Sequence, residues 1–216
     1  MTRLTNPRIP IWLKVAYSAF VAVLVPCYWV TYSPWNFLYF CDIALLVTAL
    51  AIWIESPLLV SMQAIAITVP QMLWVIDFLL RLIVGVNITG VTNYMFDPSI
   101  SLFLRALSSF HGWLPFVLLW LVSRLGYDRR AFGLQSVVAI VVLLISYLSA
   151  PAPPPSTSHP SWAVNINYVY GLDDKQPQTL MAPWLWLLLL MATNVIVIYL
   201  PTHLMLRRFF KAPSSL

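Results

Sequence analysis

Charged residues are scarce in this chain. They make up 9% of its 216 residues, while hydrophobic residues make up 61%. A soluble globular protein carries about a quarter charged residues, so this chain cannot cover a water-exposed surface. The composition excludes a soluble globular protein and predicts an integral membrane protein. The formal net charge of +5 does not imply a nucleic-acid partner, because basic residues in a membrane protein set its orientation.

Glycine and cysteine are also rare, with six and two residues respectively. So few glycines do not indicate the broken helices of secondary transporters. Cys27 and Cys41 both lie in apolar segments, which predicts no disulfide framework. The sequence has no HExxH, CxxC, P-loop, GxSxG or glycine-rich cofactor turn, and its acids, histidines and cysteines show no metal-ligand spacing. We therefore expect no metal site and no cofactor.

Long apolar segments dominate the chain instead. Six of them have about the 20 residues that cross a bilayer as a helix. The predicted spans are residues 11–30, 36–54, 58–83, 100–123, 131–149 and 183–202. Lipid offers the backbone no hydrogen-bond partners, so segments of this length must be helices rather than barrel strands. The sequence predicts an all-α, polytopic membrane helix bundle in which residues 1–216 form a single integral membrane domain.

Basic residues predict the orientation of this bundle. They form three groups: Arg3, Arg8 and Lys14; Arg124, Arg129 and Arg130; Arg207, Arg208 and Lys211. Six spans place the three groups on one side, which the positive-inside rule makes cytoplasmic. Both termini are then cytoplasmic, and residues 86–99 and 150–182 are outside. The long outer loop opens with proline and serine, and its aromatic continuation "WAVNINYVYGLDDK" fits either an interfacial segment or one that folds back as a lid.

Ionisable residues inside the predicted spans gather at a similar depth in the outer half of the bundle: Asp42, Asp77, Arg81, Arg105 and His111. Each charge in hydrocarbon costs about 2.5–3.5 kcal/mol, and convergence lowers that cost by pairing. Asp77 and Arg81 are four residues apart on one helical face, which predicts an ion pair. Arg81 and Arg105 can also extend toward water. Ser108 lies three residues from both Arg105 and His111 and shares a side with them.

Two functional hypotheses follow. In the first, the chain is an intramembrane hydrolase or acyltransferase for a lipid-like substrate of the outer leaflet. His111 is then the general base, Cys41 or Ser108 the nucleophile, and Asp42 or Asp77 orients the imidazole. The substrate-binding residues are Asp77, Arg81 and Arg105, with the arginines holding an anionic head group or oxyanion.

In the second hypothesis, the protein is not an enzyme. It binds a lipid, a ligand or a protein partner, and its intramembrane charges are structural. Proton-coupled transport uses the same residues but ranks last, because the charges cluster in one half of the membrane and form no relay across it.

Several segments carry a family resemblance: "WNFLYFCDIALL", "NYMFDPSISLFLRALSSFHGWLPFVLLWLVSRLGYDRRA", "NINYVYG" and "YLPTHLMLRRFF". There the chain resembles an uncharacterised bacterial family of small multi-pass membrane proteins, which implies the bacterial inner membrane. More distantly, it is similar to the androgen-induced membrane hydrolase family and its bacterial relatives, which pair a Thr or Cys nucleophile with a later His. That resemblance implies Cys41 as the nucleophile and His111 as the base. Asp42, an acid beside the nucleophile, departs from the family pattern.

Overall fold

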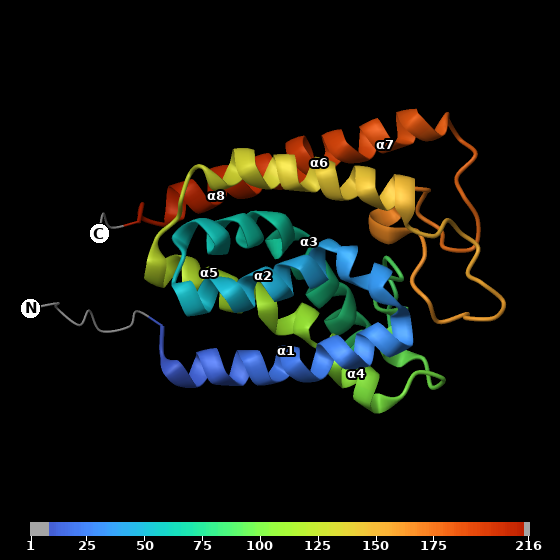
Figure 1. Ribbon diagram of the computed structural model, residues 1–216, viewed down its shortest axis with the longest axis horizontal. Coiled ribbons are helices and arrows are strands. Elements are labelled where there is room, and N and C mark those ends of the chain that lie inside the picture. The colour runs from blue at the N-terminus through green and yellow to red at the C-terminus, as the bar shows by residue number, and fades with distance from the viewer. Residues whose placement is uncertain (1–8, 214–216) are drawn as a thin grey trace, which may run out of the picture.

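The computed structural model describes residues 9–213, so Arg3 and Arg8 lie outside the described residues. Within 9–213 every regular element is a helix, which confirms the all-α prediction (Figure 1). The helices are α1 (Ile11–Tyr32), α2 (Phe40–Ile54), α3 (Pro57–Val84), α4 (Leu102–Ser108), α5 (Phe110–Leu125), α6 (Ala131–Ser149), α7 (Pro183–Ala192) and α8 (Leu200–Phe209). Short helical elements are η1 (Pro34–Leu38), η2 (Asn93–Phe96), η3 (Ile166–Tyr168) and the π-helix η4 (Thr193–Tyr199).

Five helical segments are long and apolar enough to cross a membrane: Ile11–Tyr32, Pro57–Val84, Leu102–Leu125, Ala131–Ser149 and Pro183–Phe209. They coincide with five of the six predicted spans. The remaining predicted span, 36–54, differs from its prediction. Its regular α-helix, α2, has 15 residues, about 22 Å at 1.5 Å per residue. Pro34 instead starts the 3-10 turn η1 ahead of it, because proline favours the first turn of a helix but cannot continue one.

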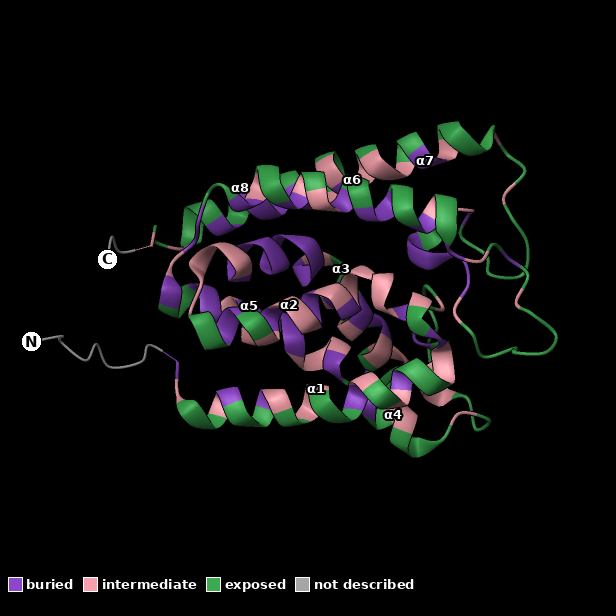
Figure 2. Ribbon diagram, in the orientation of Figure 1, coloured by how far each residue is buried: buried purple, intermediate pink, exposed green. Residues whose placement is uncertain are grey.

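Helix α3 lies at the centre of the bundle. It packs against α2, α5 and α6 and also contacts η4 and α8. In Figure 1, α1 lies on one side of this centre, and α6 with α7 and α8 lies on the other. Residues 60–68 of α3 are all buried, so neighbours surround its first half. Figure 2 shows buried positions concentrated on this central helix and exposed ones on the outer helices. Their exposed faces are apolar, as a lipid-facing surface requires.

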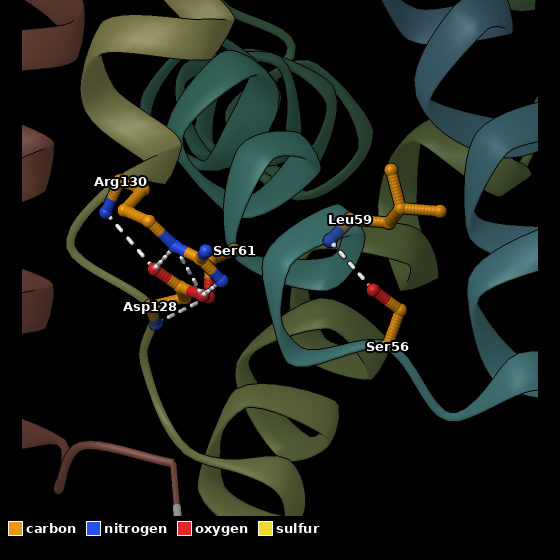
Figure 3. Close-up of polar contacts among 5 residues, drawn as sticks. All are labelled: Ser56, Leu59, Ser61, Asp128 and Arg130. Carbon is orange, nitrogen blue, oxygen red and sulfur yellow. Dashed lines mark hydrogen bonds and ion pairs between the residues drawn. The ribbon is translucent and has the colours of Figure 1, made fainter.

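The two ends of the bundle differ in their connections. The start of α1, the α5–α6 connection and the end of α8 lie at one end, which we call the inner end (Figure 1). There Ser56 caps α3 by accepting a hydrogen bond from the Leu59 amide at 3.3 Å (Figure 3). The Lys14 ammonium also lies 2.8 Å from the Glu55 carboxylate. The connections 85–101 and 150–182 lie at the opposite, outer end.

The long outer loop folds back onto the start of α2. The Ala163 amide donates to the Tyr32 carbonyl at 2.9 Å. The side chain of Asn167 makes two hydrogen bonds with the backbone at the start of α2, accepting from the Phe40 amide at 3.0 Å and donating to the Leu38 carbonyl at 2.8 Å. Of the two alternatives for this aromatic segment, the structure has the folded-back one. The loop therefore fixes the helix end that carries Cys41 and Asp42.

Candidate functional site

Asp42 lies in the first turn of α2 and is 3% exposed. Its Oδ2 accepts a hydrogen bond from the side-chain amide of Asn36 at 3.2 Å and one from the Cys41 thiol at 3.5 Å. Its Oδ1 is buried and has no hydrogen-bond partner among the described residues. Neither ion pair found between residues 9 and 213 involves Asp42. This carboxyl group is thus only half satisfied, although burying an unpaired charge is costly.

Tyrosine hydroxyls from other elements lie around this carboxyl group. Tyr28 of α1 and Tyr94 of η2 are both close enough to Asp42 to interact with it electrostatically. The Tyr28 hydroxyl shares a hydrogen bond with the Ser108 hydroxyl at 2.6 Å. The Tyr94 hydroxyl accepts a hydrogen bond from the Trp74 indole at 3.2 Å. Asp42 therefore lies where α1, α2, η2 and the α3–α4 region meet, and we call Asp42, Tyr28, Tyr94, Ser108 and Trp74 the outer cluster.

His111 adjoins the outer cluster at the start of α5. Its Nδ1 is 2.8 Å from the backbone carbonyl oxygen of Ser108, and its ring stacks on Trp74 at 5.5 Å between centroids. A carbonyl oxygen only accepts hydrogen bonds, so this contact places a proton on Nδ1. In the neutral ring the lone pair is then on Nε2, as a general base requires.

The structure brings the four predicted catalytic residues into one region but does not join them as a nucleophile and a base. Within residues 9–213, no hydrogen bond links His111 to the thiol of Cys41 or to the hydroxyl of Ser108. The thiol of Cys41 is hydrogen-bonded to the Asp42 carboxylate, and the Ser108 hydroxyl is hydrogen-bonded to the Tyr28 hydroxyl. Among these four residues, the Cys41 thiol hydrogen-bonded to the Asp42 carboxylate is therefore the arrangement most similar to a nucleophile beside a base.

Asp77 has other partners than the predicted one. It is 2% exposed and accepts hydrogen bonds from the Ile88 amide at 3.2 Å, the Thr89 amide at 2.9 Å and the Thr92 hydroxyl at 2.6 Å. The predicted ion pair with Arg81 is wrong, because neither ion pair among the described residues joins these two side chains. Three donors from the following loop satisfy the carboxylate without a basic partner.

The two arginines predicted to bind substrate also contact the α3–α4 connection. The Arg81 guanidinium donates to the Asn93 side chain and lies 4.5 Å from the centre of the Phe96 ring. Arg105 donates to the Met95 carbonyl at 3.2 Å, although its Nε is buried without a partner. Together with Asp77, these side chains hold the loop that carries Tyr94 over the outer cluster.

Sequence reasoning missed Tyr28, Asn36 and Tyr94. Tyr28 lies in an apolar span with other aromatic residues, where it is indistinguishable from a packing residue. Asn36 belongs to a turn that the pattern assigned to a span. Tyr94 has one weak signal, since the segment "NYMF" follows a span end and is aromatic. Among the described residues, no group of three or more His, Cys, Asp or Glu side chains could hold a metal ion.

Comparison of the chain with protein-family models, with curated proteins and with solved structures finds no match. The family resemblance drawn from the sequence therefore stays a prediction.

Proposed function

We propose that this chain is a membrane protein that binds the cationic head group of a lipid-like ligand at Asp42, on its outer side. The observation that carries the proposal is the buried Oδ1 of Asp42, a carboxylate oxygen without a donor. An alkylammonium group supplies both a positive charge and the missing N–H donors. Tyr28 and Tyr94, which carry further acceptor oxygens, lie within electrostatic range of the same carboxylate.

The charge of the site favours a cation over an anion. Asp42 is the one carboxylic acid of the outer cluster, which holds no Lys or Arg, and the Nδ1 of the adjoining His111 is taken up by the Ser108 carbonyl. Arg81 and Arg105, which an anionic head group would need, bind the α3–α4 connection instead. Complementary charge is what discriminates between head groups at a site of this kind.

The test compares amphiphiles that share one chain and differ in head group. The purified protein in dodecylmaltoside is titrated with dodecylammonium, dodecanol and dodecanoate, and binding is followed by the shift in thermal unfolding. We expect dodecylammonium to bind most tightly and Asp42→Asn to weaken it about tenfold or more, since hydrogen bonds to charged groups contribute about 1.5–3 kcal/mol. Asp173→Asn, the same change on an exposed acid of the outer loop, is the matched control and should bind like the wild type.

Two results refute the proposal. One is Asp42→Asn binding dodecylammonium as well as the wild type does. The other is equal binding of dodecanol and dodecylammonium, which means that Asp42 is protonated and recognises no charge.

The proposal includes six spans, cytoplasmic termini and location in the plasma membrane of a bacterium. The start of α1, the α5–α6 connection and the end of α8, which carry described members of the three basic groups, lie at this inner end (Figure 1). This arrangement agrees with the positive-inside rule. Residues 34–54, with η1 and α2 together, supply the sixth crossing. In a background without Cys27 and Cys41, a cysteine at Ser156 should react with an impermeant probe in intact cells. One at Ser214, which lies outside the described residues, should react only after permeabilisation, and its reaction in intact cells contradicts the topology.

A second candidate is the intramembrane hydrolase or acyltransferase, which the 3.5 Å contact between the Cys41 thiol and the Asp42 carboxylate favours. The carboxylate would take the thiol proton, and the thiolate would attack an ester carbonyl. A thioester then forms, and the departing alkoxide takes the proton back from Asp42 before water or an acceptor alcohol releases the acyl group.

An acyl adduct from p-nitrophenyl octanoate, detected by intact mass, tests this candidate. The adduct should disappear in Cys41→Ala, persist in the matched control Cys27→Ala, and decrease in Asp42→Asn, which removes the base. Equal adduct formation in the wild type, Cys41→Ala and Asp42→Asn excludes this candidate.

A further inference from the structure

Two basic segments that are distant in sequence meet at the inner end. The Tyr127 amide donates to the Lys211 carbonyl at 2.8 Å, which holds the tail after α8 against the α5–α6 connection. Gly126 makes this approach possible: its φ is +90°, and a Cβ atom there would lie 2.6 Å from the backbone of Pro213. The contact places Arg207, Arg208 and Lys211 beside the connection that carries Arg129 and Arg130.

One acid orders this connection and neutralises one of its arginines. The Asp128 amide donates to the Ser61 hydroxyl at 2.9 Å, and the Asp128 carboxylate accepts hydrogen bonds from the Arg130 guanidinium, the shortest at 2.8 Å (Figure 3). The Arg130 amide also donates to Asp128 Oδ1 at 3.0 Å. These bonds fix the backbone on both sides of Arg129, which remains exposed.

Within residues 9–213, the cations of the two basic segments other than Arg130 form no ion pair. Arg129 and Arg207 are both close enough to His203 to interact with it electrostatically, and the Nδ1 of His203 is 2.6 Å from the Tyr127 hydroxyl. The described residues form two ion pairs, Lys14–Glu55 and Arg130–Asp128. Of the exposed cations outside those pairs at the inner end, Arg124 lies over the Trp120 ring, and the other four make up what we call the inner rim: Arg129, Arg207, Arg208 and Lys211.

We propose that the inner rim binds the phosphate groups of anionic phospholipids in the adjoining leaflet. Guanidinium groups bind phosphate oxygens in a bidentate manner, and clusters of basic residues at the end of membrane helices attract anionic lipids. Apolar side chains of α8 place the rim at the right depth, because Leu204 is 53% exposed and Phe209 is 76% exposed. A lipid can thus set its acyl chains along α8 and its phosphate on the rim. This site is separate from the outer cluster and does not depend on the ligand proposed there.

The test uses lipids that share their acyl chains. The full-length protein in dodecylmaltoside is titrated with dioleoylphosphatidylglycerol or dioleoylphosphatidylcholine, and binding is measured by the thermal shift. We expect phosphatidylglycerol to bind more tightly, Arg129→Gln and Arg207→Gln each to weaken it several-fold, and the double variant to weaken it about tenfold or more. Lys175→Gln, which removes the same charge from the outer loop, should leave the binding unchanged.

Three outcomes overturn the proposal. Equal binding of the two lipids shows that the charge of the head group is not recognised. Equal weakening by Lys175→Gln and Arg129→Gln shows that net charge acts without a site. Full stabilisation by millimolar inorganic phosphate alone shows an anion site that does not need a lipid. If the rim variants fold poorly, the wild-type comparison of the two lipids and of phosphate still decides the question.

Discussion

Asp77 offers the sharpest test of how this protein accommodates a charge inside a membrane helix. The structure gives its carboxylate three donors, of which the Thr92 hydroxyl at 2.6 Å is the shortest. The helical spacing instead favoured Arg81 as the partner. The two accounts predict different coupling energies, so double-mutant cycles can separate them.

The magnitude follows from the exposure of the three donors. Ile88 and Thr89 are exposed, so water can replace the carboxylate at their amides, whereas Thr92 is 0% exposed. A hydrogen bond to a charged group contributes about 1.5–3 kcal/mol, and a buried hydroxyl left without its partner adds a desolvation cost. We expect Asp77→Ala to lower the free energy of unfolding by about 2–4 kcal/mol.

The assay measures the free energy of reversible unfolding in mixed micelles for two double-mutant cycles. The first pairs Asp77→Ala with Thr92→Val, a change that keeps the shape of the side chain. The second pairs Asp77→Ala with Arg81→Gln. The first should show a coupling energy of about 1.5–3 kcal/mol and the second about 0.5 kcal/mol or less. A larger coupling to Arg81 than to Thr92 would refute the loop-bracing role of Asp77.

Two further predictions concern the connections. Asn167→Ala removes both side-chain hydrogen bonds to the backbone at the start of α2. The free energy of unfolding should fall by about 1–3 kcal/mol, and proteolysis of the anchored loop should become faster. Gln176→Ala on the same loop should change neither. Hydrogen bonds from Arg130 hold the pKa of Asp128 below its ordinary value. The stability that this carboxylate contributes is therefore fully present above the ordinary aspartate pKa of about 4. It is lost as the pH falls through the lower pKa of the folded state. The unfolding temperature of Asp128→Asn should fall less steeply at acid pH than that of the wild type. An equally steep fall contradicts this.

The helices were predictable because hydropathy and length constrain a chain in lipid strongly. Five of the predicted spans coincide with long apolar helices. The segment 36–54 was less predictable, because its turn η1 contains Trp35, Phe37 and Leu38, which are as apolar as a span. The turn also contains Pro34 and Asn36. These two residues become informative only when it is known that Asn36 donates a hydrogen bond to Asp42. Hydropathy alone does not reveal such a contact.

The sequence indicates which polar residues lie inside the helices, but not their partners. Counting along the spans placed Asp42, Asp77, Arg81, Arg105 and His111 at a similar depth, and the structure links His111 through Ser108 to Tyr28, which lies within electrostatic range of Asp42. The spacing of Asp77 and Arg81 permits an ion pair but does not require it. A long arginine at a helix end can reach the exposed Asn93, whereas a short aspartate must take the nearest donors. Those donors come from a loop whose path the sequence does not fix.

Asp42 and Asp77 have the same side chain and nearly the same exposure, 3% and 2%, yet they differ in how their charge is balanced. Asp77 receives two backbone amides and a hydroxyl, so its own chain satisfies it. Asp42 receives one amide and a thiol, and one oxygen receives nothing. A carboxyl group buried in this way needs a proton or a cation. The neutral tyrosines nearby supply neither, and a proton or a cation from outside the chain would complete the balance for Asp42. This unmet requirement, which Asp77 does not share, is the reason to place Asp42 rather than Asp77 at the centre of the candidate site.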